Sequence, residues 1–325
     1  MKIGLTYDLR DAYLAMGFTE DETAELDKEE TIEGIEAALI ALGHETERIG
    51  HLKELQIALS EGKSWDLVFN ICEGIYGIGR EAQVPALLDA WQIPYTFSDP
   101  LVLSLTLHKG MTKRILRDAG IPTGAFYLIR EKSDVKSVKL DFPLFVKPVA
   151  EGSGKGIDRR STVYDQLALE EVCNRLLTDY KQEVLVEEFL PGREFTVGIV
   201  GTGEKAVCVG GIEVIISETA EENSYSRFIK ENYEGRVEYK LMGGEMAEKC
   251  EALCLNAWRL LGCRDAGRID VRLDKNGEPC FIEVNPLAGL NHIHSDLPII
   301  MYKKGHTFKD LIEKIVLSAS DRLKQ

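Results

Sequence analysis

One stretch near the end of the chain, GRIDVRLDKNGEPCFIEVNP (residues 267–286), constrains the fold more than any other. It contains Asn276 followed by Gly277, which is the strongest short signal for a two-residue turn between antiparallel strands. If these two residues make the turn, Lys275 pairs with Glu278 and both flanking segments are strands. The stretch therefore predicts a β-hairpin inside a larger sheet.

The same register gives the hairpin one polar and one apolar face, because side chains alternate between the faces of a sheet. Asp270 then lies opposite Glu283, and Arg268 lies opposite Asn285. The apolar face is expected to pack on a core and comprises Ile269, Val271, Ile282 and Val284. Two opposed carboxylates repel each other. The pair must therefore share a proton, be neutralised by arginine or bind a cation.

Asp270, Glu283 and Asn285 offer only oxygen ligands of the kind that suit Mg²⁺, which takes water and substrate phosphates as its other ligands. The alternative is a solvated strand face held by a salt bridge from Arg268. The hairpin alone does not decide between a metal site and such a face. Phosphate-binding groups elsewhere in the chain favour the metal site.

Such groups occur in FPLFVKPVAEGSGKG (142–156), where Lys147 on a predicted strand precedes a glycine-rich turn at 151–156. Backbone N–H groups of such a turn can approach phosphate oxygens closely. The spacing is not that of a P-loop. Lys109 begins a predicted helix upstream, and Glu187, Glu188 and Glu194 follow downstream. These carboxylates could bind an adenine amino group and ribose hydroxyls, or they could simply be solvated strand ends.

Composition limits the partners and the compartment. The chain has 325 residues, 44% of them hydrophobic, and a formal net charge of −15, which argues against a general nucleic-acid binder but allows a local site for an anion such as ATP. No apolar run is long enough to span a bilayer, and the first residues lack the features of a signal peptide. The seven cysteines form no CxxC pair and are expected to be buried and reduced. We therefore expect a cytoplasmic protein without a nucleic-acid or membrane partner.

The order of elements predicts a mixed α/β and α+β chain with three parts. Strands and helices alternate over residues 1–103, which predicts a doubly wound parallel sheet without a GxGxxG motif. A long helical stretch at 100–119 leads into a small α+β module at 104–186, and a strand-rich part with two helices occupies 187–325. Residues 217–243 are polar and have no clear period, so we expect a functional or mobile loop there.

Five ordered segments, HKGMTKRILRDAGIPT, PLFVKPVAEGSGKG, VLVEEFLPGREFTV, LGCRDAGRIDVRLD and FIEVNPLAGL, resemble the ATP-grasp superfamily and, within it, the D-alanine–D-alanine ligase family. The resemblance runs along nearly the whole chain. It implies an ATP-grasp fold of three domains (1–103, 104–186 and 187–325) with a Rossmann-like parallel sheet in the first. It also implies ATP as cofactor and two Mg²⁺ per site.

The resemblance assigns roles to particular residues. ATP would be held by Lys109, Lys147, Glu151, Gly152, Ser153, Gly154, Gly156, Glu187, Glu188, Phe189, Leu190, Glu194 and Phe281. Within this set, Glu187 would meet the adenine amino group and Glu194 the ribose. The metal ligands would be Asp270, Glu283 and Asn285. Arg268, Ser153 and Gly289 would act at the reacting groups, with Arg268 facing the transferring phosphoryl group.

The implied reaction follows from charge. A carboxylate is a poor electrophile, so attack on the γ-phosphate of ATP converts it to an acyl phosphate, and an amine then displaces phosphate. Metal ions and cationic side chains would screen the approach of two anions. The alternatives are an amino-acid ligase of different specificity, a non-catalytic nucleotide-binding module, and a kinase that stops at phosphoryl transfer.

The chain departs from the family pattern on the substrate side. The usual signature of two glycines followed by Ser and Glu, whose Glu handles the first ammonium group, is replaced by LTYDLRDAYLAMG (5–17), and Glu73 stands where a histidine is expected. The candidate substrate residues are Tyr7, Asp8, Arg10, Glu73, Tyr76, Arg80, Lys230 and Ser295. We therefore expect D-alanine to be a poor first substrate. For His292 and His294, lining or structural roles are favoured over a zinc site, and a homodimer is expected because the family often forms one.

Overall fold

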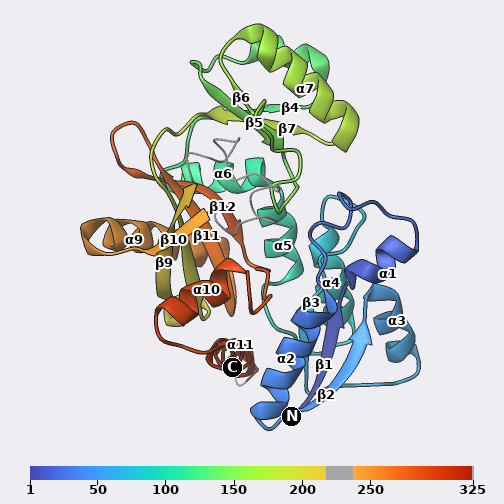
Figure 1. Ribbon diagram of the computed structural model, residues 1–325. Helices are drawn as coiled ribbons and strands as arrows, with labels where there is room; N and C mark the ends of the chain where they lie inside the picture. The colour runs from blue at the N-terminus through green and yellow to red at the C-terminus, as the bar shows by residue number, and fades with distance from the viewer. Residues whose placement is uncertain (217–236, 324–325) are drawn as a thin grey trace.

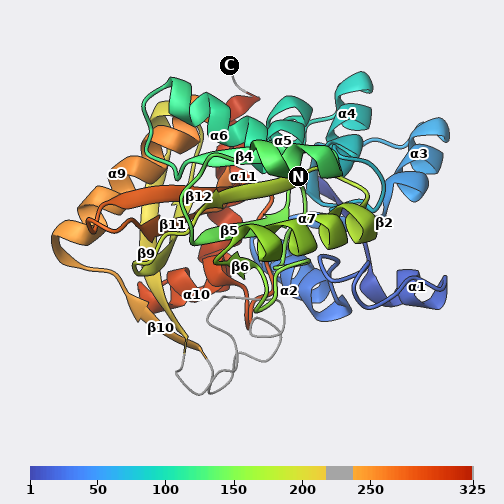
Figure 2. The same ribbon diagram turned by 90° about the horizontal axis from the view of Figure 1, so that it is seen from above.

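The computed structural model describes residues 1–216 and 237–323, which form three β-sheets (Figure 1). A three-stranded sheet lies at the lower right of Figure 1, a four-stranded sheet at the top and a five-stranded sheet at the left. Seen from above in Figure 2, the helices α9 and α3 lie at opposite ends of the molecule, as they do in Figure 1. The predicted mixture of a parallel sheet with antiparallel sheets is confirmed.

The N-terminal sheet is parallel, with strand order β2-β1-β3. Its strands are β1 (Lys2–Tyr7), β2 (Glu45–Gly50) and β3 (Leu67–Ile71). The surrounding helices are α1 (Arg10–Ala15), α2 (Glu29–Ala41), α3 (Leu52–Ser60) and α4 (Gln83–Ala90). The segment IPYTF, expected to be a further strand, contributes only a single bridge from Tyr95 to Val68.

The helical stretch expected at 100–119 is two helices, α5 (Pro100–Leu107) and α6 (Lys109–Asp118). The break falls at His108, whose ring accepts a hydrogen bond from the N–H of Met111 and so caps α6. This break makes Lys109 the first residue of α6 and points α6 in a new direction (Figure 1).

The middle sheet is antiparallel, with strand order β4-β7-β5-β6. Its strands are β4 (Phe126–Ile129), β5 (Leu144–Pro148), β6 (Thr162–Val163) and β7 (Val184–Glu188). Helix α7 (Gln166–Tyr180) starts at Asp165, which accepts a hydrogen bond from the N–H of Ala168. Its buried face packs against the sheet. The domain boundary drawn after residue 186 falls inside β7.

The C-terminal sheet has strand order β10-β9-β8-β11-β12. Its strands are β8 (Glu194–Val200), β9 (Val207–Ile216), β10 (Val237–Leu241), β11 (Ala266–Leu273) and β12 (Pro279–Asn285). The helices are α9 (Gly244–Leu261), α10 (Asp296–Lys303) and α11 (Phe308–Arg322). Trp258 of α9 is fully buried against the apolar face of the hairpin. Strand β10 lies within 217–243, so the expectation of an irregular loop is wrong for 237–241.

The hairpin of β11 and β12 carries the predicted pairs at its functional end: Arg268 lies opposite Asn285, and Asp270 lies opposite Glu283. Nearer the turn the prediction is wrong. The N–H of Asp274 donates to the carbonyl of Glu278 at 2.9 Å, so the turn has three residues rather than two. Gly277 takes a φ of 81°, which suits a turn closed by a residue in the left-handed region.

A bulge compensates for the extra turn residue, because the register shifts again between Asp270 and Val271. Phe281 consequently enters the core, where it is 1% exposed, and Ile282 leaves it. The expectation that Ile282 packs in the core is therefore wrong, whereas Ile269, Val271 and Val284 are buried as expected.

Two expectations from composition can be compared with the structure. Six of the seven cysteines are buried, Cys208 is half-buried, and all seven are free thiols. Within residues 1–216 and 237–323, the helices are too short or too polar to cross a membrane.

Candidate active site

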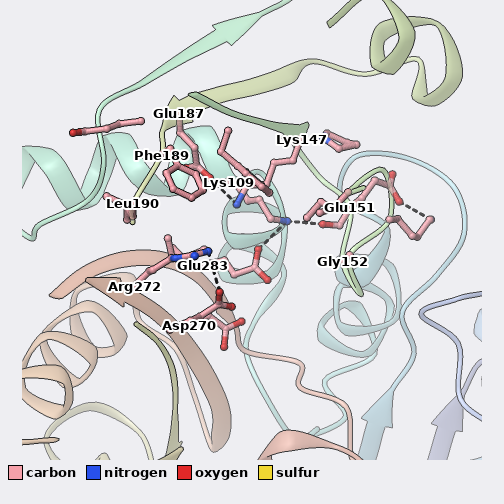
Figure 3. A pocket seen from close by; sticks show the side chains of 18 residues that line it. Lys109, Lys147, Glu151, Gly152, Glu187, Phe189, Leu190, Asp270, Arg272 and Glu283 are labelled. Atoms are coloured by element: carbon pink, nitrogen blue, oxygen red, sulfur yellow. Dashed lines mark hydrogen bonds and ion pairs between the residues drawn. The ribbon is translucent and has the colours of Figure 1, made fainter. Parts of the chain in front are cut away.

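A cavity lies between the middle and C-terminal sheets, and we call it the first cavity (Figure 3). It is built from the start of α6, the end of β5 with the glycine-rich turn, the link between β7 and β8, and the polar face of the hairpin. Its walls are formed by Lys109, Phe145, Lys147, Pro148, Glu151, Gly152, Gly154, Lys155, Ile157, Glu187, Glu188, Phe189, Leu190, Glu194, Asp270, Arg272, Ile282 and Glu283.

Glu187 connects two buried lysines at the back of the first cavity. One carboxylate oxygen lies 2.8 Å from Nζ of Lys113 and the other lies 2.9 Å from Nζ of Lys147. Burial alone would raise the pKa of Glu187, but the two ammonium groups outweigh burial and lower its pKa to about 2. Burial also opposes the charge of Lys147, yet Glu187 and Glu283 raise its pKa. Lys147 is thus held cationic and in place, and it lines the cavity.

The glycine-rich turn is tied to its surroundings by Glu151. Its carbonyl accepts a hydrogen bond of 2.6 Å from Nζ of Lys109, and its carboxylate accepts one of 2.6 Å from Gln182 and pairs with Lys155 at 2.5 Å. Ser153 and Gly154 both have positive φ, 49° and 73°. Consecutive residues of this kind can turn backbone N–H groups toward an anion.

The polar face of the hairpin closes the opposite wall. Asp270 accepts a hydrogen bond of 2.7 Å from Thr196 and one of 3.2 Å from Arg268. Glu283 lies 3.5 Å from Nζ of Lys109, which therefore points at both Glu151 and Glu283 (Figure 3). Among the described residues, the buried Nδ2 of Asn285 has no hydrogen-bond partner.

This donor set fits Mg²⁺. Two carboxylates and one amide oxygen leave coordination positions for phosphate oxygens and water, which is how Mg²⁺ is usually bound beside nucleotides. In the part of the chain that the structure describes, no three His, Cys, Asp or Glu side chains come together in a way that could hold a metal without such outside ligands. Asp270, Glu283 and Asn285 would therefore hold the ion together with the substrate.

A second cavity adjoins the first and shares three residues with it, Lys109, Gly152 and Glu283. It extends toward the N-terminal sheet. Its other walls are formed by Arg10, Glu20, Ala24, Glu25, Leu26, Asp27, Lys28, Thr31, Glu73, Glu81, Thr106, Leu107, Ser153, Tyr239, Arg268, Val284, Asn285, Pro286, Leu287, Gly289, Asn291, His294, Ser295 and Asp296. A molecule in this cavity would therefore lie next to one in the first cavity.

The structure brings together some of the predicted substrate residues and not others. Arg10, Glu73 and Ser295 line the second cavity, as do the predicted Arg268, Ser153 and Gly289. Four other candidates do not line it: Tyr7, Asp8, Tyr76 and Arg80. Lys230 lies outside the described residues.

These four side chains lie outside the wall of the second cavity, in four different environments. Asp8 is buried and accepts hydrogen bonds from Tyr13 at 2.6 Å and from the N–H of Gly74 at 2.9 Å, so it supports the local fold. Tyr76 is 70% exposed. Tyr7 packs at the edge of the N-terminal core. Arg80 is buried and pairs with Glu25, which lines the second cavity.

Glu25, which was not predicted from the sequence, links the N-terminal part to the glycine-rich turn. Its carboxylate pairs with Arg80 at 2.7 Å and accepts a hydrogen bond from the N–H of Gly152. Arg80 also donates to the carbonyl of Ala150 at 2.9 Å. No local sequence signal marks Glu25, because it lies in an acidic segment before α2.

Other differences concern the first cavity. Phe281 does not line it, because the bulge turns its side chain into the core and brings Ile282 to the wall. Gly156 is not a wall residue either; a Cβ there would lie 2.5 Å from the ring of Pro148. Arg272 was missed, although it shares the face of Arg268 and Asp270 by simple alternation. It pairs with Glu194 at 3.3 Å and stacks over Phe189.

His292 and His294 lie in different environments. His294 lines the second cavity, and burial lowers its pKa. The ring of His292 contacts Phe308, with 5.7 Å between ring centroids. These positions agree with lining and structural roles.

Comparisons with known proteins agree with this geometry. Residues 115–317 match the family model for the C-terminal part of D-Ala–D-Ala ligases. A D-alanine–D-alanine ligase of Aquifex aeolicus is 34% identical over 88% of this chain and 93% of its own. The chain belongs to the D-alanine–D-alanine ligase family. An uncharacterised protein of Sinorhizobium fredii is 30% identical over 87% of this chain and 85% of its own.

The fold is also that of a solved family member. The crystal structure of the D-alanine–D-alanine ligase of Bacillus anthracis in complex with ATP covers 100% of this chain, with a TM-score of 0.74 and 22% identity. The expected ATP-grasp architecture is thereby confirmed, and the chain is an ATP-grasp ligase of the D-alanine–D-alanine ligase family.

Proposed function

We propose that this ligase phosphorylates the carboxylate of one D-alanine with ATP and joins the resulting acyl phosphate to the amine of a second D-alanine, with release of ADP and phosphate. The observation that carries the proposal is the meeting of two cavities at Lys109, Gly152 and Glu283. A nucleotide in the first cavity would present its γ-phosphate to a carboxylate in the second.

D-alanine is proposed because relatives with an assigned function, such as those of Aquifex aeolicus and Bordetella pertussis, are named D-alanine–D-alanine ligases. The expectation that D-alanine is a poor first substrate receives no support from these relatives. Because the Ser-Glu signature is missing, other residues of this chain must bind the first ammonium group.

In this proposal the residues of the first cavity bind and orient ATP. Lys147 and Lys109 would contact its phosphates, and the turn around Ser153 and Gly154 would offer backbone N–H groups. The link from Glu188 to Leu190 would border the adenine, with Glu194 near the ribose. Because both oxygens of Glu187 already pair with lysines, its main contribution is to hold Lys147 at the phosphates.

Two Mg²⁺ ions are proposed at Asp270, Glu283 and Asn285, where they would neutralise phosphate charge during transfer. Arg268 lines the second cavity and pairs with Asp296 at 2.8 Å and with Asp270. It would turn to the oxyanion that forms when the amine attacks the acyl phosphate. Because the reaction consumes ATP, we place it in the cytoplasm. The homodimer expected from the resemblance stays a prediction.

The test measures ADP and phosphate release from purified protein with Mg²⁺, ATP and D-alanine alone, and identifies the product by mass spectrometry. We expect one ADP per D-alanyl-D-alanine formed. ADP release with no dipeptide would favour a kinase. No ADP release with any amino acid, despite measurable ATP binding, would favour a non-catalytic nucleotide-binding protein.

A further inference from the structure

Among the described residues, three carboxyl groups on the wall of the second cavity form no ion pair with a cationic side chain. They come from three separate segments: Asp27 precedes α2, Glu73 follows β3, and Glu81 precedes α4. Among the residues that the structure describes, none of the three forms an ion pair within 4.0 Å. Asp27 is hydrogen-bonded by Thr31, whereas Glu73 and Glu81 have no such partner in residues 1–216 and 237–323.

The cations nearest to this group are engaged elsewhere. Arg80 pairs with Glu25 at 2.7 Å and donates to the carbonyl of Ala150. Lys109 lies between Glu151 and Glu283. The remaining cationic wall residues also have carboxylate partners, apart from the exposed Lys28 at the rim: Arg10 pairs with Glu20, and Arg268 pairs with Asp296. Among the described residues, this part of the wall therefore has more carboxyl groups than cations free to pair with them.

Ionisation of all three carboxyl groups is unfavourable when no ligand is bound. Burial raises the pKa of Asp27 to about 7, and nearby Asp8 adds to the rise. Burial likewise raises the pKa of Glu81 to about 7, although Arg80 opposes the rise. The pKa of Glu73 is raised by burial and then by the negative charges of Glu81, Glu25 and Asp27. Neighbouring buried carboxyls can all ionise only when a cation lies between them.

We infer that Asp27, Glu73 and Glu81 bind the ammonium group of the amino acid whose carboxylate is phosphorylated. The inference rests on the proposed function, because it places that amino acid in the second cavity with its carboxylate toward Lys109 and Glu283. It also explains how the chain manages without the family's Ser-Glu signature.

The occupant is an organic ammonium group rather than a metal ion. Within the described ranges, Asp27, Glu73 and Glu81 are not among any group of three or more His, Cys, Asp or Glu side chains arranged to hold a metal ion, and the proposed reaction places no phosphate here to complete a metal site. An ammonium group offers three N–H donors, one for each carboxyl group, and needs no fixed coordination geometry. As the ammonium group binds, the carboxyl groups ionise, and each proton they lose passes to the solvent.

The test compares Glu73→Gln and Glu81→Gln with the matched control Glu61→Gln, an exposed glutamate of the same N-terminal region. Each cavity variant should raise the KM for D-alanine at least about tenfold, the effect of one lost charge-assisted contact, and leave the KM for ATP within about twofold. Glu81→Asp should restore part of the loss. An unchanged KM for D-alanine in both cavity variants would overturn the inference.

The pH profile separates this role from a merely structural one. Because the carboxyl groups must ionise to bind an ammonium group, kcat/KM for D-alanine should rise with pH through about 7 in the wild type. In Glu81→Gln the rise should move to lower pH, because the charge that raises the pKa of Glu73 is gone. A profile that does not move would contradict the inference.

Calorimetry with an inert ATP analogue and Mg²⁺ keeps the inference testable if no turnover is found. Binding of D-alanine should release protons in wild type and fewer in Glu81→Gln. D-lactate, which lacks the ammonium group, should bind at least about tenfold more weakly. Equal affinity for D-lactate would overturn the inference, and ammonium-dependent binding without dipeptide formation would overturn only the proposed function.

A further experiment decides whether the three carboxyl groups bind the α-ammonium group or also a side-chain ammonium group. It compares the binding of 2,3-diaminopropionate with that of D-alanine. If 2,3-diaminopropionate binds no better than D-alanine, the three carboxyl groups hold the α-ammonium group. If it binds at least about tenfold better and this gain is lost in Glu73→Gln, they also hold a side-chain ammonium group. Both results support the site, whereas a gain that persists in both variants would place the cation elsewhere and contradict it.

Discussion

The two cavities share three wall residues, but they differ in whether their buried charged groups are paired within the protein. In the first cavity the buried charges are paired within the protein: Glu187 holds two lysines, and its pKa is lowered to about 2. In the second cavity, Glu73 and Glu81 form no ion pair within 4.0 Å among the described residues, and the pKa of each is raised by burial and by neighbouring carboxylates. The first cavity is thus preorganised before any ligand arrives, whereas the second is completed by its ligand.

The largest effect is expected from a substitution in the hairpin, because Glu283 lines both cavities. Glu283→Gln keeps the volume of the side chain but removes the charge that the proposed metal site requires. We expect turnover to fall by at least about a hundredfold while the fold is retained. Steady-state ADP release and circular dichroism measure the two effects.

Glu278→Gln on the same hairpin is the matched control. Glu278 is exposed and pairs with Lys249 at the surface, where such a pair contributes little. This variant should keep wild-type turnover. Full activity of Glu283→Gln at ordinary Mg²⁺ concentrations would be incompatible with the two-metal assignment.

Lys147→Ala tests the preorganised cavity. It removes a phosphate contact, and it leaves one oxygen of the buried Glu187 without its partner. We expect the KM for ATP to rise by at least about tenfold, and stability to fall by about 3 kcal/mol, as when one member of a buried ion pair is removed. Lys136→Ala, at an exposed lysine of the same region, is the control. Unchanged ATP kinetics would mean that Lys147 does not touch the phosphates.

The sequence predicted the first cavity far better than the second, for a physical reason. Apart from Lys109 at the start of α6, the groups of the first cavity lie on strands or in the segments that follow them, so period and turn type place many of them. The opposition of Asp270 and Glu283 was predicted from an Asn-Gly turn and side-chain alternation, and it holds because the bulge offsets the extra turn residue. Within the hairpin, the prediction failed near the turn, where a third turn residue and a bulge exchanged the positions of Phe281 and Ile282.

Many wall residues of the second cavity lie in loops or at helix starts, and these segments meet only in the folded chain. Glu25 and Asp27 lie before α2, Glu81 lies before α4, and Asp296 begins α10. No periodicity relates these positions, and an acidic segment such as 20–30 reads as a solvated surface. A single sequence therefore identified Glu73, Arg10 and Ser295 but could not show what they face.

The contrast between the cavities also predicts opposite effects on stability, and the second cavity gives the smaller one. Glu81 has a pKa of about 7 in the folded protein, above its ordinary value of 4.5. Between these values the folded chain binds more protons than the unfolded chain, so this carboxyl group lowers the free energy of unfolding as pH rises. Glu81→Gln removes the penalty, which is fully present above pH 7 and absent below about pH 4.

We therefore expect Glu81→Gln to be more stable than the wild type at pH 8 by about 2 kcal/mol, or a few degrees in Tm, with no difference near pH 4. Thermal melts at both pH values check this, with Glu61→Gln as the unaffected control. The same variant loses affinity for the amino acid, so a gain in stability would accompany a loss of function. A variant that is equally stable at both pH values would mean that the Glu81 carboxyl group already has a partner in the folded chain, and the contrast between the two cavities would disappear.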